Sequence, residues 1–282
     1  MVRLGARRVV AVGMAVLLAL GVAGSQRGAA VGGVAKPGPL PADPYMSTSQ
    51  DYQRSLQASA LLVRQCMAAR GHPDFPLDPR DPVDPITISA AMVATDYGVL
   101  DMDSARRWGY GWDPAEDAAR QPKGRRMTSA EFADYPACEA EAGRRLVRGV
   151  DVKGDWFYAS TRAVEVQKAV RRDPRLLAAW NTWSRCMAGQ GFTAYPDPVA
   201  AYTDTAWHRG SDGNTPHTQR ERATAVADVI CKRRHHTVET WHTVTAQKQA
   251  ADIAQHRDGY AGGLWQLRLY RANIDEVLRT LG

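Results

Sequence analysis

The chain has 282 residues, of which 44% are hydrophobic, 23% charged and 8% aromatic. This balance is that of a globular protein, and it excludes a chain that is mainly disordered or embedded in a membrane. The formal net charge is +6, but three of the basic residues, Arg3, Arg7 and Arg8, lie near the N-terminus. The rest of the chain is therefore too weakly basic to predict a protein that binds nucleic acid.

Residues 1–24 have the three parts of a secretory signal peptide. Basic residues come first, an uncharged apolar run covers residues 9–23, and small residues around Gly24 would admit signal peptidase. The run is shorter than the roughly 20 residues that span a bilayer, so we expect cleavage and a mature chain without a transmembrane span. No cysteine precedes Cys66, which excludes acylation as a lipoprotein. The sequence predicts a secreted or extracytoplasmic protein.

Residues 25–48 are rich in Gly, Ala and Pro and show no periodicity. Such a composition predicts a disordered leader. We expect two related helical units after it, the first over residues 49–150 and the second over residues 151–282 with a long C-terminal helix.

An internal repeat is the reason for expecting two units. Residues 66–76 read CMAARGHPDFP and residues 186–196 read CMAGQGFTAYP. Apolar residues upstream of each motif are spaced by four, three and four positions, which marks one face of an α-helix. Gly71 and Gly191 then lie where a left-handed cap would end that helix. We interpret the repeat as an ancient duplication. The upstream apolar residues are Leu56, Ala60, Val63 and Met67 in the first copy, and Leu176, Trp180, Trp183 and Met187 in the second.

The four cysteines predict structural disulfides. An exported chain with an even number of cysteines and no C-x-x-C motif is typical of disulfide bonding. Each repeat is followed by one further cysteine, so among the three possible connectivities the duplication favours Cys66–Cys138 and Cys186–Cys231. A zinc site formed by these cysteines is disfavoured because none has a close ligand partner.

The remaining segments also have helical patterns, and no alternating run is long enough to predict a strand. The long stretch over residues 220–281 keeps helical spacing, and we expect Gly259, Gly262 and Gly263 to break or bend it. The sequence therefore predicts an all-α protein. The other predicted helices cover residues 89–97, 103–108, 160–170 and 197–208.

Three motifs follow one another along the chain. They are RWGYG, then W-x-x-CM-x-x-x-G-x-x-x-YP, then VADVICK followed by a long helix. Together they resemble the motifs of a family of uncharacterised exported actinobacterial proteins, and the resemblance covers residues 49–282. It implies export and a helical fold, and it implies no mechanism, since the family has no established activity. VADVICK is followed here by RRHHTV, where the family usually has a Thr-Asn-Leu-Val type of sequence. Chemistry on these histidines would therefore be specific to this protein.

One cluster has the residue types of a metal site. In a helix, His235, Glu239 and His242 would be spaced i, i+4, i+7 and share one face, a spacing that can bind zinc or copper. Such a site with an open position could activate water for hydrolysis. The alternative is a solvated basic helix face, which the preceding Lys232, Arg233 and Arg234 favour because they would repel a cation.

Two further groups could bind ligands. Trp108, Tyr110 and Trp112 would suit a glycan if their rings are exposed on one surface, although such rings more often fill a core. Arginine groups could meet an anionic wall polymer, although they are usually a solvated surface. These arginines are Arg144, Arg145, Arg148, Arg171, Arg172 and Arg175.

The usual enzyme signatures, such as G-x-S-x-G or a Gly-rich phosphate loop, are not present in the sequence. We therefore expect a non-enzymatic binding or scaffolding protein of the cell envelope or the medium, without a resident cofactor. A metal-binding protein or metal-dependent hydrolase, and a glycan-binding module, remain as alternatives.

Overall fold

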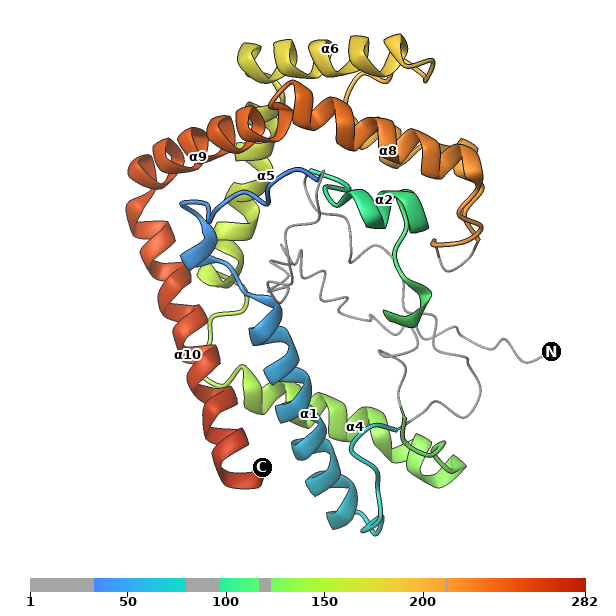
Figure 1. Cartoon of the computed structure of the whole chain (residues 1–282). Helices are drawn as coiled ribbons and strands as arrows, with labels where there is room; N and C mark the ends of the chain where they lie inside the picture. Colours follow the sequence, from blue (N-terminus) through green and yellow to red (C-terminus); the bar gives the residue numbers. More distant parts are fainter. Residues whose placement is uncertain (1–32, 80–96, 117–122, 211–212) are drawn as a thin grey trace, which may run out of the picture.

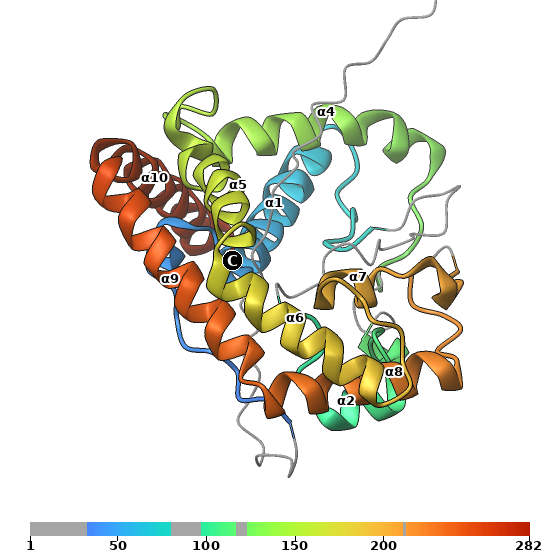
Figure 2. The same ribbon diagram turned by 90° about the horizontal axis from the view of Figure 1, so that it is seen from above.

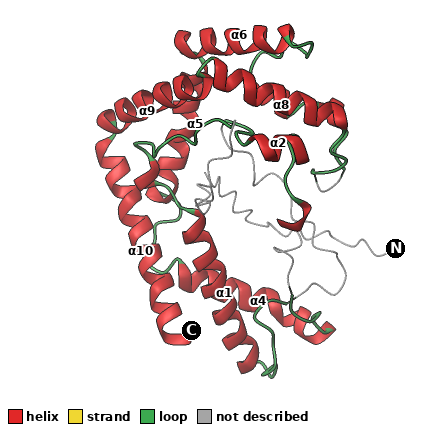
Figure 3. Ribbon diagram, viewed as in Figure 1, coloured by secondary structure: helices red, strands yellow, loops and turns green. Residues whose placement is uncertain are grey.

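The computed structural model of the protein describes residues 33–79, 97–116, 123–210 and 213–282, which form helices and loops without a strand (Figure 3). The all-α prediction is confirmed. Over these residues, no helix combines the length and the apolar composition needed to cross a membrane. The predicted signal peptide, and residues 89–96 of a predicted helix, lie outside the described residues. The helices are η1 (Asp43–Tyr45), α1 (Ser49–Ala69), α2 (Met102–Trp108), α4 (Ser129–Leu146), η3 (Asp155–Phe157), α5 (Tyr158–Arg171), α6 (Pro174–Gly189), α7 (Pro198–Tyr202), η4 (Thr205–Trp207), α8 (Gln219–Arg234), α9 (Thr237–Gln255) and α10 (Arg257–Leu281).

The first disulfide joins α1 to α4. Cys66, near the end of α1, is bonded to Cys138 of α4, with 5.6 Å between the two Cα atoms. Apolar side chains of both helices form one core, and α10 completes it with Ile274 and Val277 (Figure 1). Helix α10 therefore packs on α1, about 200 residues before it in the sequence. The other buried residues of this core are Ala58, Leu62, Val63, Met67, Phe75, Met127, Cys138, Ala142 and Leu146.

The second disulfide joins α6 to α8. Cys186 is bonded to Cys231, with 5.8 Å between the Cα atoms, so both predicted pairings are confirmed. α8 lies between α6 and α2 (Figure 1). Met102, Ala105 and Tyr110, from the segment around α2, share a core with the disulfide-linked helices. Helices of the two predicted units, residues 49–150 and 151–282, therefore pack on one another. α2 of the first unit contacts α8 of the second, and α1 contacts α10.

The prediction of which helix face is buried is correct for the second copy of the repeat and partly wrong for the first. In α6, Leu176, Trp180, Trp183 and Met187 are all buried, as predicted. In α1 the prediction is wrong for Leu56, which is 47% exposed. α1 turns a different stripe inward because it contacts both α4 and α10. That stripe consists of Ala58, Leu61, Leu62, Val63 and Met67.

The C-terminal stretch is three helices, and its breaks lie away from the glycines that were expected to cause them. α8 ends at Arg234 with His235 as its cap, and His236 has a left-handed backbone with φ of 49° just before α9. A second break at His256 separates α9 from α10. α6 runs alongside α9 (Figure 2) and lies at the top of the view in Figure 1.

The glycines of α10 allow close packing instead of breaking the helix. A Cβ atom added at Gly259 would lie 2.2 Å from Cζ of Tyr158, and one at Gly262 would lie 2.5 Å from Oδ2 of Asp155. A Cβ atom added at Gly263 would lie 3.1 Å from the backbone oxygen of Asp155. The glycines are needed because η3 and the start of α5 approach the backbone of α10 too closely for any side chain.

Part of the predicted leader is folded. Val34 and Ala42 are buried, and the amide of Ala42 donates to Oε1 of Gln249 at 3.0 Å. The ring of Tyr45 meets that of Tyr260 edge-on at 5.0 Å. The prediction of disorder over residues 25–48 is therefore wrong from residue 33 onward, because helices α9 and α10 supply partners for a segment with little periodicity of its own.

The segment predicted as one helix over residues 197–208 is divided. α7 ends at Tyr202, and η4 begins at Thr205 after Asp204, whose side chain caps it. The Oδ2 atom of Asp204 also accepts a hydrogen bond from the hydroxyl of Tyr195 at 2.6 Å. An aspartate that caps a new helix and binds a neighbouring loop favours a turn over continuation of α7.

Candidate functional site

The three residues of the predicted metal site are not brought together. The premise of one helix is wrong, since His235 ends α8 while Glu239 and His242 lie in α9 after the left-handed His236. The Nε2 atom of His242 lies 3.0 Å from the backbone oxygen of Gly38, so that ring fastens the N-terminal segment. Within the described part of the chain, no group of three or more His, Cys, Asp or Glu side chains is arranged to hold a metal.

The three aromatic residues proposed for glycan binding do not form an exposed platform. Tyr110 is 2% and Trp112 is 6% exposed. Trp108 is half-buried and meets the ring of His217 edge-on at 5.6 Å. The rings are buried or half-buried because Gly109 and Gly111 let this segment lie directly on α8 and the loop before it. Added Cβ atoms there would lie 2.8 Å from Cγ of Glu221 and 2.3 Å from Cε1 of His217, respectively.

The arginine groups proposed for an anionic polymer are partly used within the fold. Arg148 pairs with Glu276 at 2.9 Å. Arg175 pairs with Asp173 at 3.0 Å, and it holds the pKa of that carboxyl well below its usual range. The guanidinium of Arg171 lies 6.0 Å from the centre of the Trp180 ring. The remaining three, Arg144, Arg145 and Arg172, are exposed.

The two repeats end their helices in the same way. The amides of His72 and Phe192, each six residues after its cysteine, donate to the carbonyls of Met67 and Met187 at 2.9 and 3.1 Å. Gly71 has φ of 92° and Gly191 has φ of 84°, the left-handed conformation expected of a helix cap. The repeats therefore place corresponding residues against the partner helix of each disulfide.

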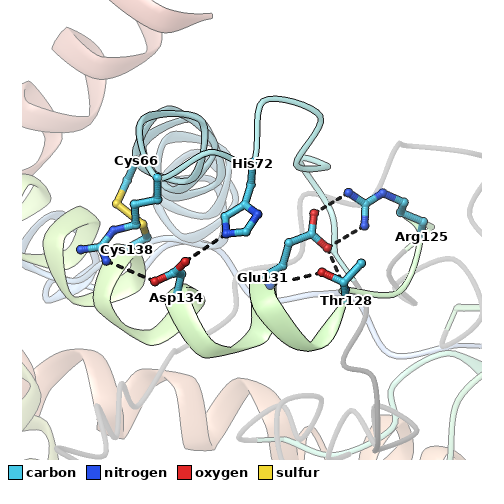
Figure 4. Close-up of polar contacts among 8 residues, drawn as sticks. Cys66, His72, Arg125, Thr128, Glu131, Asp134 and Cys138 are labelled. Carbon is cyan, nitrogen blue, oxygen red and sulfur yellow. Dashed lines mark hydrogen bonds and ion pairs between the residues drawn. A yellow bond between two sulfur atoms is a disulfide. The ribbon is translucent and has the colours of Figure 1, made fainter.

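In the first copy this position is polar. His72 points from the loop after α1 toward Asp134 of α4, with 3.0 Å between Nε2 and Oδ2 (Figure 4). Arg70 approaches the other carboxylate oxygen at 3.4 Å. The hydrogen bond from His72 is the largest cause that lowers the pKa of Asp134. A histidine and an arginine thus cover the face of α4 one turn before Cys138.

In the second copy the corresponding position is apolar and open. Gln190 and Phe192 stand where the first copy has Arg70 and His72, and Ala227 stands four residues before Cys231, as Asp134 does before Cys138. Instead of an ion pair there is a shallow groove of about 400 Å³. Its lining residues are Arg106, Gln190, Phe192, Gln219, Arg222, Ala223, Val226, Ala227 and Ile230.

The groove has an apolar floor and a basic rim. Its floor is a stripe of α8 formed by the exposed Ala223 and the half-buried Val226 and Ile230, at i, i+3 and i+7. Arg106 of α2 and Arg222 of α8 carry positive charge along it, and the described lining includes no acidic side chain. Such a surface can bind an apolar helix face that carries acidic residues beside it.

Buried polar groups fix α8 beneath the groove. Lys232 donates to Oδ2 of Asp228 at 2.8 Å and to the carbonyl of Val99 at 3.2 Å. The indole of Trp183 donates to the other oxygen of Asp228 at 2.9 Å. Both charged side chains are at most 1% exposed, and burial raises the pKa of Asp228. The aspartate and lysine of the VADVICK motif are therefore an internal clamp joining α8 to α6 and to the segment before α2.

A second buried carboxylate anchors the start of α8. Glu221 is fully buried, and its Oε1 atom accepts hydrogen bonds from the amide of Tyr110 and from Arg209, both at 3.1 Å. The hydroxyl of Thr218 accepts from the amide of Glu221 at 3.1 Å and so caps the helix. α4 begins in the same way, with Thr128 as the cap and the buried Glu131 bound by Arg125 (Figure 4). The pattern T-x-x-E, which indicates a capped helix start, is visible in the sequence at both places, but it gives no sign that the two glutamates are buried.

Comparison with models of protein families, with curated proteins and with solved structures finds no match to this chain. The groove and the buried groups that support it are therefore the basis for the function proposed below.

Proposed function

We propose that this is an exported protein that works by binding, and that the groove on α8 is the docking site for a helix of a partner protein. The observation that carries the proposal is the open apolar groove itself. Its floor, α8, is held to α6 by a disulfide and by the bond from Trp183 to Asp228, and to the segment before α2 by the bond from Lys232 to Val99. The metal and glycan alternatives are not pursued, because their residues do not form the sites that they require.

The shape of the groove favours a helix as its occupant. Its floor follows one helical stripe from Gln219 to Ile230, which corresponds to about 16 Å along α8 at 1.5 Å per residue. Ala223 and Ala227 keep the floor low, so a second helix can approach closely, and Val226 and Ile230 offer side chains for ridge-and-groove contact. An amphipathic helix placed there would lie between α2 and α6.

The charge of the groove favours an acidic partner. Arg222 has no ion-pair partner among the described residues, and Arg106 pairs only with the exposed Asp103 at 3.2 Å. A carboxylate placed beside either guanidinium would find a free or easily exchanged partner, whereas a basic helix would be repelled. Specificity therefore comes from Arg106 and Arg222, and affinity comes from the apolar floor.

Export and duplication complete the proposal. Two disulfides and the secretory pattern of residues 1–24 support cleavage of a signal peptide and a location in the envelope or the medium, without lipid acylation. The matched caps and the matched T-x-x-E starts of α4 and α8 support an ancient duplication, after which one copy kept a polar contact and the other an open groove. The resemblance to uncharacterised exported actinobacterial proteins is part of the same proposal.

Peptide binding tests the docking site. The probe is a labelled amphipathic peptide of about 15 residues, long enough to form a helix, with Leu on one face and Glu beside it. We expect the oxidised protein to bind it and to bind a Lys version of the same peptide at least about tenfold more weakly, with fluorescence anisotropy as the readout. Arg222→Glu should reverse that preference, whereas Arg172→Glu, at the exposed position directly after α5, should not.

Equal binding of the acidic and basic peptides, or an Arg222→Glu variant that behaves as the unmodified protein, would exclude this site. Export is tested separately by mass spectrometry of the protein recovered outside the cell. The proposal expects a chain that begins close to residue 25 and whose mass rises by four hydrogen atoms when its two disulfides are reduced to four thiols. A full-length chain retained in the cell would contradict it.

A further inference from the structure

The outer face of α10 carries a straight stripe of exposed residues along the whole helix. Arg257, Arg268 and Arg279 recur every eleven residues, so they lie about 16 Å apart on nearly the same line. Ala261, Trp265, Ala272 and Asp275 lie between them on that line, and all seven residues are exposed. The stripe is unrelated to the groove on α8.

Trp265 is the most exposed of the large apolar side chains in the described chain, at 64%. The other described tryptophans are buried or half-buried and have core or ring contacts. An indole left in water loses the gain of burial that a side chain of this size normally contributes. A single exposed apolar side chain is common on protein surfaces, so it is the alignment of this indole with three arginines that points to a use outside the fold.

The three arginines of the stripe have no ion-pair partner within the described ranges, whereas the acidic residue on the same line does. Asp275 is bonded to Arg54 of α1 at 2.5 Å, so its charge is compensated. Asp258, next to Arg257, is the other exposed carboxylate at this face. The stripe as a whole is positive, with the indole between its first two arginines.

α10 is a rigid support for this stripe. Its inner face buries Leu267, Ile274 and Val277, and its glycines fit against η3 and α5. Figures 1 and 2 both place α10 at an outer edge of the molecule. A flat surface can therefore reach the full length of the stripe.

We propose that the outer face of α10 binds an anionic phospholipid surface, with Trp265 in the headgroup region and the three arginines against lipid phosphates. Arginines alone would suit any polyanion, including a dissolved one. The protruding indole favours lipid, because tryptophan gains most at a boundary that is apolar on one side and wet on the other. The inference goes beyond the docking site and does not depend on it.

Vesicle sedimentation tests the proposal. The processed, oxidised protein is mixed with vesicles of phosphatidylcholine alone, or with phosphatidylglycerol added, and the bound fraction is measured at low and high salt. We expect binding only to the anionic vesicles, weakening as salt screens the charges. A variant with Gln in place of Arg257, Arg268 and Arg279 should bind on the order of 100-fold more weakly, about fivefold for each arginine.

A matched control separates the stripe from net charge. Gln in place of Arg144, Arg145 and Arg172 removes the same charge from exposed sites elsewhere and should change binding less than about threefold. Tryptophan emission of the unmodified protein should shift to shorter wavelength on the anionic vesicles, and Trp265→Phe should abolish that shift.

Three results would overturn the proposal. They are no binding to anionic vesicles, equal weakening by the two triple variants, and binding that a soluble polyphosphate matches while Trp265→Phe changes nothing. The last result would assign the stripe to a dissolved polyanion. None of them bears on the peptide-binding test of the α8 groove.

Discussion

Replacing Lys232 with Met should destabilise the protein strongly, and the loss should depend on pH. The substitution keeps the length and the apolar stem of the side chain and removes the ammonium group. Asp228 would then retain the hydrogen bond from Trp183 and lose the one from Lys232, in a site where neither charged side chain is more than 1% exposed. The carbonyl of Val99 would also lose its bond to the ammonium group.

The expected cost is about 3–5 kcal/mol at pH 7, because breaking a buried pair leaves an uncompensated charge. Burial already raises the pKa of Asp228, and Lys232 opposes that rise. Without Lys232 the pKa rises further above the value of about 3.9 in the unfolded chain. As the pH falls through this raised pKa, the folded variant takes up a proton that the unfolded chain does not, so its deficit in stability shrinks.

Urea unfolding followed by circular dichroism measures this at pH 7 and pH 5. The double variant Lys232→Met with Asp228→Asn is the control, since replacing both charges removes the unpaired carboxylate. It should recover most of the lost free energy of unfolding. Two results would refute this account of the clamp. One is a decrease in the free energy of unfolding of Lys232→Met below about 1 kcal/mol at pH 7. The other is a decrease of the same size at pH 7, at pH 5 and in the double variant.

Three further predictions concern stability. Gly259→Ala should lower the free energy of unfolding by about 1–3 kcal/mol, because the added methyl group would clash with Tyr158 of α5. Gly143→Ala, in open space on α4, should instead raise the midpoint of thermal unfolding slightly. Equal effects of the two substitutions would contradict the close packing of α10 on α5. Glu131→Gln should lower the free energy of unfolding by about 2 kcal/mol at pH 7. The pKa of Glu131 in the folded protein is lowered to about 2, chiefly by the hydrogen bond from Arg125. The stabilisation by the ionised carboxylate is therefore lost as the pH falls below 4.5 toward that value, and the difference between the variant and the unmodified protein should fade. Replacing Cys186 and Cys231 with Ser should lower the free energy of unfolding by about 4 kcal/mol, the loop-closure estimate for a separation of 45 residues, and an unchanged urea midpoint would argue against a stabilising role.

The sequence predicted the elements whose local signals agree with their tertiary surroundings. α6 has Asp173 as its cap, Pro174 at its first position and an apolar stripe, and the structure shows the cap bond to the Arg175 amide and the burial of the whole stripe. The cysteine pairing was likewise predictable, because the repeat relates Cys66 to Cys186 and each has one further cysteine downstream.

What could not be predicted depends on contacts between distant segments. Gly259 signals a helix break in the sequence, and only the approach of Tyr158 turns it into a packing contact. His242 has the identity of a metal ligand, and only the return of Gly38 to α9 gives it a different partner. The groove on α8 depends on α2, which is more than a hundred residues away along the chain, so helical periodicity alone gave no sign of it.

The packing of α10 on α1 has a consequence for the order of folding. The core between α1 and α4 includes Ile274 and Val277 of α10, which leave the ribosome or cross a membrane well after α1 and α4. Until they arrive, α1 and α4 have an incomplete core. The Cys66–Cys138 bond needs only the first half of the chain. In an exported chain it can hold the two helices together during that interval, so this disulfide acts as a temporary substitute for the helix that is still to come.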